Sequence, residues 1–249
     1  MTVLVVSVAG MALFLWPFLA LGAPSTGAAV SLALGTVVAS AAVETLTRRL
    51  DSRRFALLAA IAALDAALRL VLVNGIGGFS PIFFLILVAG YVFGPSFGFL
   101  CGAISLLASA VVTGGIGPWL PYQLFACGWV GALAGLAGSY RHGAYDWRDV
   151  VVLGAVAVIT GYLFGALLDV WDWTTFYRAA PSYGYVAGAS PGELLRRFGS
   201  FYLATSAWWD SFRAVGDVIA VIVLGLPFMA ALGRMRSRFT FATEAEPAV

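Results

Sequence analysis

Asp65 and Arg69 are opposite charges that lie one helical turn apart inside the apolar stretch 55–73. On a solvent-exposed helix they would form an ordinary i,i+4 ion pair. Within a membrane, each such side chain costs roughly 2.5–3.5 kcal/mol on insertion scales, so it usually faces a bundle interior, a partner or a ligand. This pair is therefore the first candidate for a binding site.

A second polar stripe lies in the last apolar segment, where Asp210, Arg213 and Asp217 are three and four residues apart. At 100° per residue, these side chains fall within about 60° of one another on one helix face. Both stripes lie toward the outer ends of their segments, so we expect them to line an outward-biased pocket. The alternative is that Asp65–Arg69 and Arg213–Asp217 are self-contained pairs that hold helices in register.

Aromatic and amide groups are expected at the mouth of this pocket. Trp119, Tyr122 and Gln123 stand at the start of the sixth apolar segment, and Asn74 begins a Gly-rich connection on the same side. Gly and Pro clusters at membrane depth are tolerated where the backbone lines a cavity or packs on protein. An interfacial aromatic belt is the alternative for the aromatic residues. The candidate binding residues are Asp65, Arg69, Asn74, Trp119, Tyr122, Gln123, Asp210, Arg213 and Asp217.

Membrane spans are the elements that must position these residues. The 249-residue chain is 61% hydrophobic and 10% charged, with a mean hydropathy of +0.96, outside the range of soluble globular domains. A span needs about 20 apolar residues, and eight segments approach that length, the fourth being short. They are 3–21, 27–43, 55–73, 81–93, 97–112, 120–137, 150–170 and about 201–232. We expect an all-α polytopic membrane protein with about eight transmembrane helices.

Basic residues mark alternate connections between these segments. All 14 basic residues are Arg, and those within 48–54, 141–148 and 234–238 predict cytoplasmic sides by the positive-inside rule. Both termini are then cytoplasmic, and the expected location is the cell inner or plasma membrane. The net charge of +2 is too small to indicate a nucleic-acid partner.

Enzyme and metal-site hypotheses find little support in the residues. His142 is the only histidine and falls in a predicted cytoplasmic connection, far from the polar stripes, so we expect no His-based nucleophile or metal centre. No Walker-type phosphate loop is present, so we expect no ATP hydrolysis by this chain. Cys101 and Cys127 lie inside predicted spans and are expected to be buried free thiols. We expect no cofactor.

Three sequence runs together carry a family resemblance. They are 77–103 with its Gly-rich ends, 114–123, and the closing Arg213-Ala-Val-Gly-Asp217 and Leu224-Gly-Leu-Pro227 sequences before the last Arg residues. As a set, they resemble the substrate-binding S-component of energy-coupling factor (ECF) transporters. The resemblance covers about 55–238.

The resemblance implies a six-helix core over 55–238. Here a transmembrane hairpin over 1–46 and a basic cytoplasmic linker over 47–54 precede that core, and a tail over 239–249, expected to be disordered and cytoplasmic, follows it. The implied partners are a transmembrane coupling subunit and two cytoplasmic ATPases. The family's Ala-x-x-x-Ala signature, which contacts the coupling subunit, maps onto Ala59, Ala63 and Ala67. Ordinary packing in an Ala-rich helix is the alternative for this stripe.

The resemblance also implies a binding and transport subunit, not an enzyme, that takes a vitamin or related micronutrient from the outer side. Three carboxylates against two guanidinium groups near the pocket favour a neutral or cationic ligand. The aromatic-rich stretch 171–200, expected as a long outer connection, favours a large ring system such as cobalamin, ahead of a thiamine-pathway pyrimidine or riboflavin. Two alternatives stay open: a structural or assembly membrane protein, and an ion-coupled secondary transporter, although the paired broken helices of many such transporters are not evident.

Overall fold

The computed structural model describes residues 2–19, 21–47, 50–71, 82–141, 143–178 and 180–244. All regular structure within these residues is helical, which confirms the predicted all-α class. The helices are α1 (Thr2–Leu15), α2 (Thr26–Leu46), α3 (Ser52–Val71), α4 (Ile82–Phe93), α5 (Pro95–Thr113), α6 (Leu120–Gly138), α7 (Trp147–Phe176), α8 (Pro191–Thr205) and α9 (Ala207–Glu244).

Most of these helices suit a bilayer. Within the described residues, α2, α5, α6, α7 and α9 are long and apolar enough to cross a membrane, and α1 and α4 are shorter apolar helices. Large apolar side chains such as Val5, Ile159 and Val223 are exposed on the outside of the bundle. Contiguous apolar surface of this kind is unfavourable in water and suits lipid. The predicted polytopic membrane fold is confirmed.

The prediction of a long outer connection over 171–200 is wrong. α7 continues to Phe176, and a separate helix, α8, begins at Pro191 before α9 starts at Ala207. Ser190 caps α8, because its hydroxyl accepts a hydrogen bond from the Glu193 amide at 3.4 Å. α8 is amphipathic and buries Leu194 and Phe201. At the other end of the last segment, α9 runs to Glu244, into the tail that was expected to be disordered.

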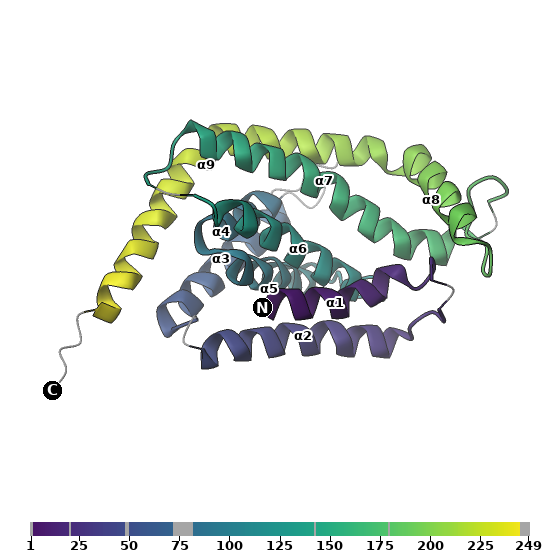
Figure 1. Ribbon diagram of the computed structural model, residues 1–249, viewed down its shortest axis with the longest axis horizontal. Coiled ribbons are helices and arrows are strands. Elements are labelled where there is room, and N and C mark those ends of the chain that lie inside the picture. Colours follow the sequence, from purple (N-terminus) through teal and green to yellow (C-terminus); the bar gives the residue numbers. More distant parts are fainter. Residues whose placement is uncertain are drawn as a thin grey trace.

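The helices form three layers (Figure 1). α3 to α6 make the centre, α1 and α2 lie along one side of it, α7 and α9 lie along the other, and α8 sits at one end. Close approach holds the central layer together, because a Cβ atom on Gly98 of α5 would lie 2.1 Å from the Gly131 carbonyl oxygen of α6. Only glycine permits this backbone contact, which is the usual way that helices associate in lipid.

The two ends of the bundle differ in chemistry. At one end, here called the basic end, the α2–α3, α4–α5 and α6–α7 connections meet the C-terminal part of α9. One cavity there is lined by both Arg54 and Arg236, and another by both Arg141 and Arg234. At the opposite end, here called the aromatic end, Trp16, Trp173, Tyr185, Leu194 and Phe201 form their own buried cluster. This division follows the alternation of Arg-containing and aromatic connections in the sequence.

The N-terminal hairpin is packed firmly on the core. Phe14 of α1 makes an edge-to-face contact with Tyr122 of α6 at 5.4 Å between ring centroids, and Trp129 Nε1 donates a hydrogen bond to Ser7 Oγ at 2.9 Å. Trp16, which follows α1, contacts the Tyr185 ring at 5.9 Å. The hairpin thus supplies part of the aromatic end.

Candidate functional site

α3 presents two different faces. Asp65 has no exposed surface, whereas Ala59, Ala63 and Ala67 on the opposite side are exposed. The separation follows the helical period, because positions four residues apart share a face. Among the residues that the structure describes, neither carboxylate oxygen of Asp65 has a hydrogen-bond partner. The charge of Arg69 nevertheless acts electrostatically on the Asp65 carboxylate.

α9 orients its charges toward α7. Arg213 forms an ion pair with Asp210, and its Nη1 also donates to the Gly161 carbonyl oxygen at 3.2 Å. The guanidinium carbon lies 5.3 Å from the centroid of the Phe164 ring, within cation–π range. Asp217 is buried, and its Oδ1 atom has no hydrogen-bond partner. Arg213 is therefore paired with Asp210 rather than with Asp217.

Small residues on α7 make room for these side chains. A Cβ atom on Gly165 would lie 1.9 Å from Asp210 Oδ2, and one on Gly161 would lie 3.2 Å from the Cβ atom of Ala214. One turn after Gly165, Asp169 is buried and has an unpartnered Oδ2 atom. Sequence reasoning missed Asp169, although its four-residue spacing from the two glycines marks the face of α7 that meets α9.

The polar side chains of five helices converge in the interior. The Cys127 thiol of α6 interacts electrostatically with Asp65, Arg69 and Arg213. The Cys101 thiol of α5 interacts electrostatically with Asp65. Asp169 interacts with both Asp210 and Arg213. The two stripes predicted on separate helices thus face the same region. We call this group the interior polar cluster: Asp65, Arg69, Cys101, Ser105, Cys127, Asp169, Asp210, Arg213 and Asp217.

Sequence reasoning also missed a polar stripe on α5. Cys101, Ser105 and Ser109 are four residues apart and have no exposed surface. Ser105 interacts with the Cys101 thiol, whereas the Ser109 hydroxyl has no hydrogen-bond partner among the described residues. Unsatisfied buried hydroxyls are rare in native proteins and usually indicate a missing partner. Both cysteines are free and buried, as predicted.

A cavity of about 330 Å³ opens one turn outward from the interior polar cluster. The indole rings of Trp119 and Trp171 form part of its wall, with centroids 5.7 Å apart. Asp172 lines the cavity and acts electrostatically on Asp169, three residues earlier on α7. This outer cavity is lined by Trp119, Gln123, Leu168, Trp171, Asp172 and Phe176.

Residues 53–224 match the family model described as ECF transporter, substrate-specific component. The chain belongs to this family. The match begins in α3 and ends within α9, so it leaves α1 and α2 outside, in agreement with the resemblance noted from the sequence. No curated protein sequence and no solved structure matches the chain. Members of the family are membrane subunits that bind and transport a small-molecule substrate together with other ECF subunits, and they are not enzymes.

In this substrate-specific component, the predicted site residues that the structure describes divide into three groups. Asp65, Arg69, Asp210, Arg213 and Asp217 lie in the interior polar cluster. Trp119 and Gln123 line the outer cavity. Tyr122 is turned toward α1 and packs on Phe14. Asn74 and most of its Gly-rich connection lie outside the described residues, as does His142.

α8 lies over this end of the substrate-specific component and is fixed by polar contacts. Tyr202 donates a hydrogen bond to Asp210 Oδ2 at 2.8 Å. Arg197 Nη1 donates to the Pro181 carbonyl oxygen at 3.2 Å, which ties the segment after α7 to α8. Hydrogen bonds from Arg196 and Arg197 lower the pKa of Glu193 from 4.5 to about 2. α8 and the segment before it are therefore held together in part by charged groups that contact water.

Proposed function

We propose that this substrate-specific component binds a vitamin or a related micronutrient from the aromatic end and delivers it with an ATP-driven ECF module. The observation that carries the proposal is the carboxylate of Asp65, which is wholly buried with two unpartnered oxygens. Leaving a buried polar group unsatisfied costs about 1–3 kcal/mol, and more for a charged one. A ligand that donates hydrogen bonds to Asp65 would recover that free energy.

In this proposal, the ligand enters through the outer cavity and reaches the interior polar cluster. Trp119, Gln123 and Asp172 stand at the entrance, and Asp169 stands one turn inward. Tyr122 of α6 packs on Phe14 of α1 and stabilises α6 through this contact. Asp65, Arg69, Asn74, Asp210, Arg213 and Asp217 complete the proposed set.

The charge of the interior polar cluster favours a neutral or cationic ligand. Its four carboxylates, those of Asp65, Asp169, Asp210 and Asp217, face two guanidinium groups. Asp210 already neutralises Arg213 through an ion pair. An anionic ligand would add to an excess of negative charge at low dielectric, where like-charge repulsion is strong.

The size of the outer cavity bears on which vitamin is bound. Its volume of about 330 Å³ is near the lower end of the roughly 300–1,000 Å³ range of small-molecule sites. A thiamine-pathway pyrimidine suits a cavity of this size. A corrinoid such as cobalamin, which the aromatic outer segment favours, is larger than this cavity and requires it to widen.

The basic end is proposed to face the cytoplasm, with both termini on that side, following the positive-inside rule. The exposed stripe of Ala59, Ala63 and Ala67 on α3 is proposed as the contact with a transmembrane coupling subunit, which associates with two cytoplasmic ATPases. Small residues let helix backbones approach closely in lipid. No other ECF subunit is needed to form the binding cavity in this proposal.

Ligand identification by mass spectrometry and thermal stability tests the proposal. The purified chain is analysed for a co-purified small molecule, and its melting temperature is measured with cobalamin, riboflavin and a thiamine-pathway pyrimidine. A ligand at 100 times its Kd adds about 2.7 kcal/mol of stability. Asp65→Asn should weaken binding at least tenfold, whereas Arg238→Gln at the exposed C-terminal part of α9 should not.

The same preparation separates the alternatives. Absence of any ligand and any thermal shift would favour a structural or assembly protein. Uptake into vesicles that is driven by an ion gradient, with this chain alone, would favour a secondary transporter. Uptake that requires both ATP and the other ECF subunits would support the proposed delivery.

A further inference from the structure

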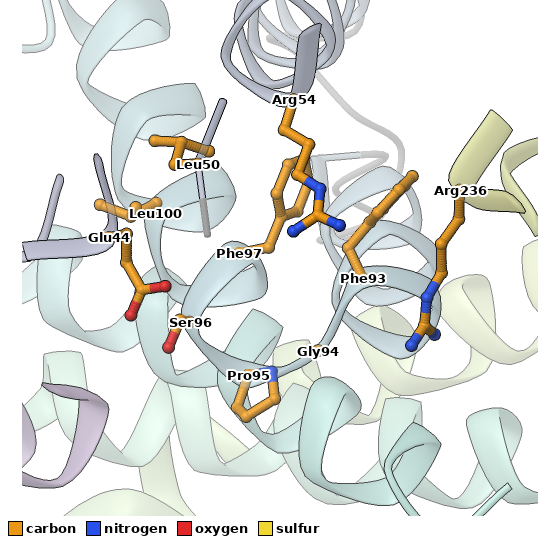
Figure 2. Close-up of a pocket in the computed structure, with 10 residues that line it drawn as sticks. All are labelled: Glu44, Leu50, Arg54, Phe93, Gly94, Pro95, Ser96, Phe97, Leu100 and Arg236. Carbon is orange, nitrogen blue, oxygen red and sulfur yellow. The ribbon is translucent and has the colours of Figure 1, made fainter. Parts of the chain in front are cut away.

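A second cavity, of about 290 Å³, lies at the basic end. It forms where the C-terminal end of α2, the start of α3, the α4–α5 connection and α9 come together (Figure 2). Glu44, Arg54, Ser96, Phe97 and Arg236 are the lining residues that carry the argument. None of them belongs to the interior polar cluster or to the outer cavity, so the proposed vitamin site does not account for this feature.

Glu44, in the last turn of α2, is the unusual residue of this cavity. It is only 5% exposed, and its Oε1 atom has no hydrogen-bond partner among the described residues. Figure 2 shows the Glu44 carboxylate directed toward Ser96, at the start of α5. A buried carboxylate of this kind is stabilised by a cationic hydrogen-bond donor. Glu44 therefore indicates that one end of the occupant carries a positive charge.

The other lining groups favour a negative charge. Arg54 and Arg236 reach the cavity from α3 and α9, and Arg236 is held by a hydrogen bond from Nη1 to the Val92 carbonyl oxygen at 2.6 Å. These two guanidinium groups suit a phosphate, which arginine recognises through parallel hydrogen bonds.

The start of α5 adds to this positive side. Gly94 is the N-cap residue with φ of 98° and makes no side-chain cap, and Pro95 follows at the first helical position. The next amides, those of Ser96 and Phe97, belong to the first helical turn, whose N–H groups have no partner within the helix. The N-terminus of a helix attracts anions through such amides and its dipole.

We propose that this cavity binds a phosphoethanolamine group, with the ammonium at Glu44 and the phosphate between Arg236, Arg54 and the start of α5. The Phe93 and Phe97 rings, 4.7 Å apart at their centroids, cover its short alkyl chain. Such a group is supplied by the headgroup of phosphatidylethanolamine or by a soluble phosphoethanolamine ester. Basic pockets between transmembrane helices are known to accept lipid headgroups. A bound headgroup would link α2 of the N-terminal hairpin to α5 and α9.

Native mass spectrometry of the delipidated full chain tests the proposal. The chain is titrated with phosphatidylethanolamine, phosphatidylcholine and phosphatidylglycerol of identical acyl chains. We expect at least tenfold stronger retention of phosphatidylethanolamine, because a quaternary ammonium cannot donate to Glu44 and a glycerol headgroup carries no cation. Equal retention of the three lipids, or a preference for phosphatidylglycerol, overturns the proposal.

Two variants test which lining residues produce the selectivity for phosphatidylethanolamine. Glu44→Gln should lower phosphatidylethanolamine retention about tenfold and raise that of phosphatidylglycerol, whereas Arg236→Gln should lower both. Arg238→Gln, a nearby exposed Arg that does not line the cavity, is the matched control and should behave as the natural chain. A Glu44→Gln chain with unchanged lipid selectivity overturns the proposal, and if it also fails to assemble with the other ECF subunits, the cavity belongs to a protein partner.

The source of the group is resolved by competition on the natural chain, which does not depend on any variant folding. Displacement of the lipid by millimolar O-phosphoethanolamine supports a soluble ester. Retention of phosphatidylethanolamine against this competitor supports the lipid. Vitamin binding is measured in parallel, and its persistence in Glu44→Gln keeps this test separate from that of the substrate site.

Discussion

Tyr202 of α8 donates a hydrogen bond to Asp210 of α9 across the break between the two helices, with 2.8 Å between the Tyr202 hydroxyl and Asp210 Oδ2. Asp210 also forms the ion pair with Arg213. The same carboxylate therefore connects α8, which covers the aromatic end, to the interior polar cluster. This hydrogen bond is one link between α8 and the interior; the interaction of Asp169 with Ser206, the C-cap residue of α8, is another.

Tyr202→Phe removes this connection and leaves the Asp210 carboxylate with fewer partners. Hydrogen bonds to charged groups contribute about 1.5–3 kcal/mol, so we expect faster amide hydrogen exchange in α8, with the central helices unaffected. Tyr140→Phe, at a highly exposed tyrosine of the basic end, is the matched control. Identical exchange of α8 in the variant and the natural chain would show that packing alone holds α8.

Arg213→Ala breaks a buried ion pair, and removing one partner of such a pair costs about 3–5 kcal/mol. We expect a lower melting temperature and weaker ligand binding, with assembly of the ECF module retained where the chain folds. The double variant Asp210→Asn, Arg213→Gln removes both charges and should recover most of the stability but not the binding. Recovery of binding in the double variant would remove Arg213 from the proposed site.

The sequence predicts what depends on local periodicity and misses what depends on packing between helices. The two faces of α3 follow from the spacing of Asp65 and Ala63, and the structure separates them as expected. The choice of Asp210 over Asp217 by Arg213 was not predictable, because both lie about one turn away. The Gly161 carbonyl oxygen and the space at Gly165, both on α7, decide it.

α8 was also not predicted, although the signals for a helix are present in its sequence. Ser190 followed by Pro191 is a typical helix start, and Glu193 and Arg197 have ion-pair spacing. The aromatic residues of this stretch masked these signals by suggesting an interfacial loop. The cavity at Glu44 could not be predicted, since it needs residues from α2, α5 and α9 to meet in three dimensions.

Ala63→Trp tests the exposed stripe of α3. The indole would fill the surface where another helix backbone must approach closely, so we expect loss of assembly with the coupling subunit and unchanged vitamin binding by the chain alone. Ile219→Trp, on an exposed position of α9, is the control for a bulky side chain in lipid. Co-purification measures assembly, and an Ala63→Trp chain that assembles normally would reduce the stripe to ordinary surface.

The lowered pKa of Glu193 predicts that the stability of the aromatic end depends on pH. Its folded pKa of about 2 lies below the usual value of 4.5, so its contribution to stability is complete above pH 4.5 and disappears as the pH falls toward 2. We expect a change in tryptophan fluorescence in this range, because Trp173 donates to the Tyr183 carbonyl oxygen at 2.7 Å in the segment that Arg197 holds. The change should be smaller in Glu193→Gln, and equal profiles would exclude this role.

Two glycines of α7 make a matched pair of tests for the geometry of the interior polar cluster. A Cβ atom at Gly165 would overlap Asp210 Oδ2 at 1.9 Å, whereas at Gly161 its nearest neighbour, the Ala214 Cα, would be at 3.1 Å. Ala gains about 1 kcal/mol over Gly in a helix interior, and overpacking costs about 1–3 kcal/mol. Gly161→Ala should therefore be close to neutral, while Gly165→Ala should lower the melting temperature and weaken ligand binding by displacing the Asp210 carboxylate. Gly165→Ala combined with Asp210→Ala and Arg213→Gln should recover stability without binding, because the overlap is relieved and the Arg213 charge is removed together with its partner carboxylate; a triple variant that binds normally would place Asp210 and Arg213 outside the substrate site.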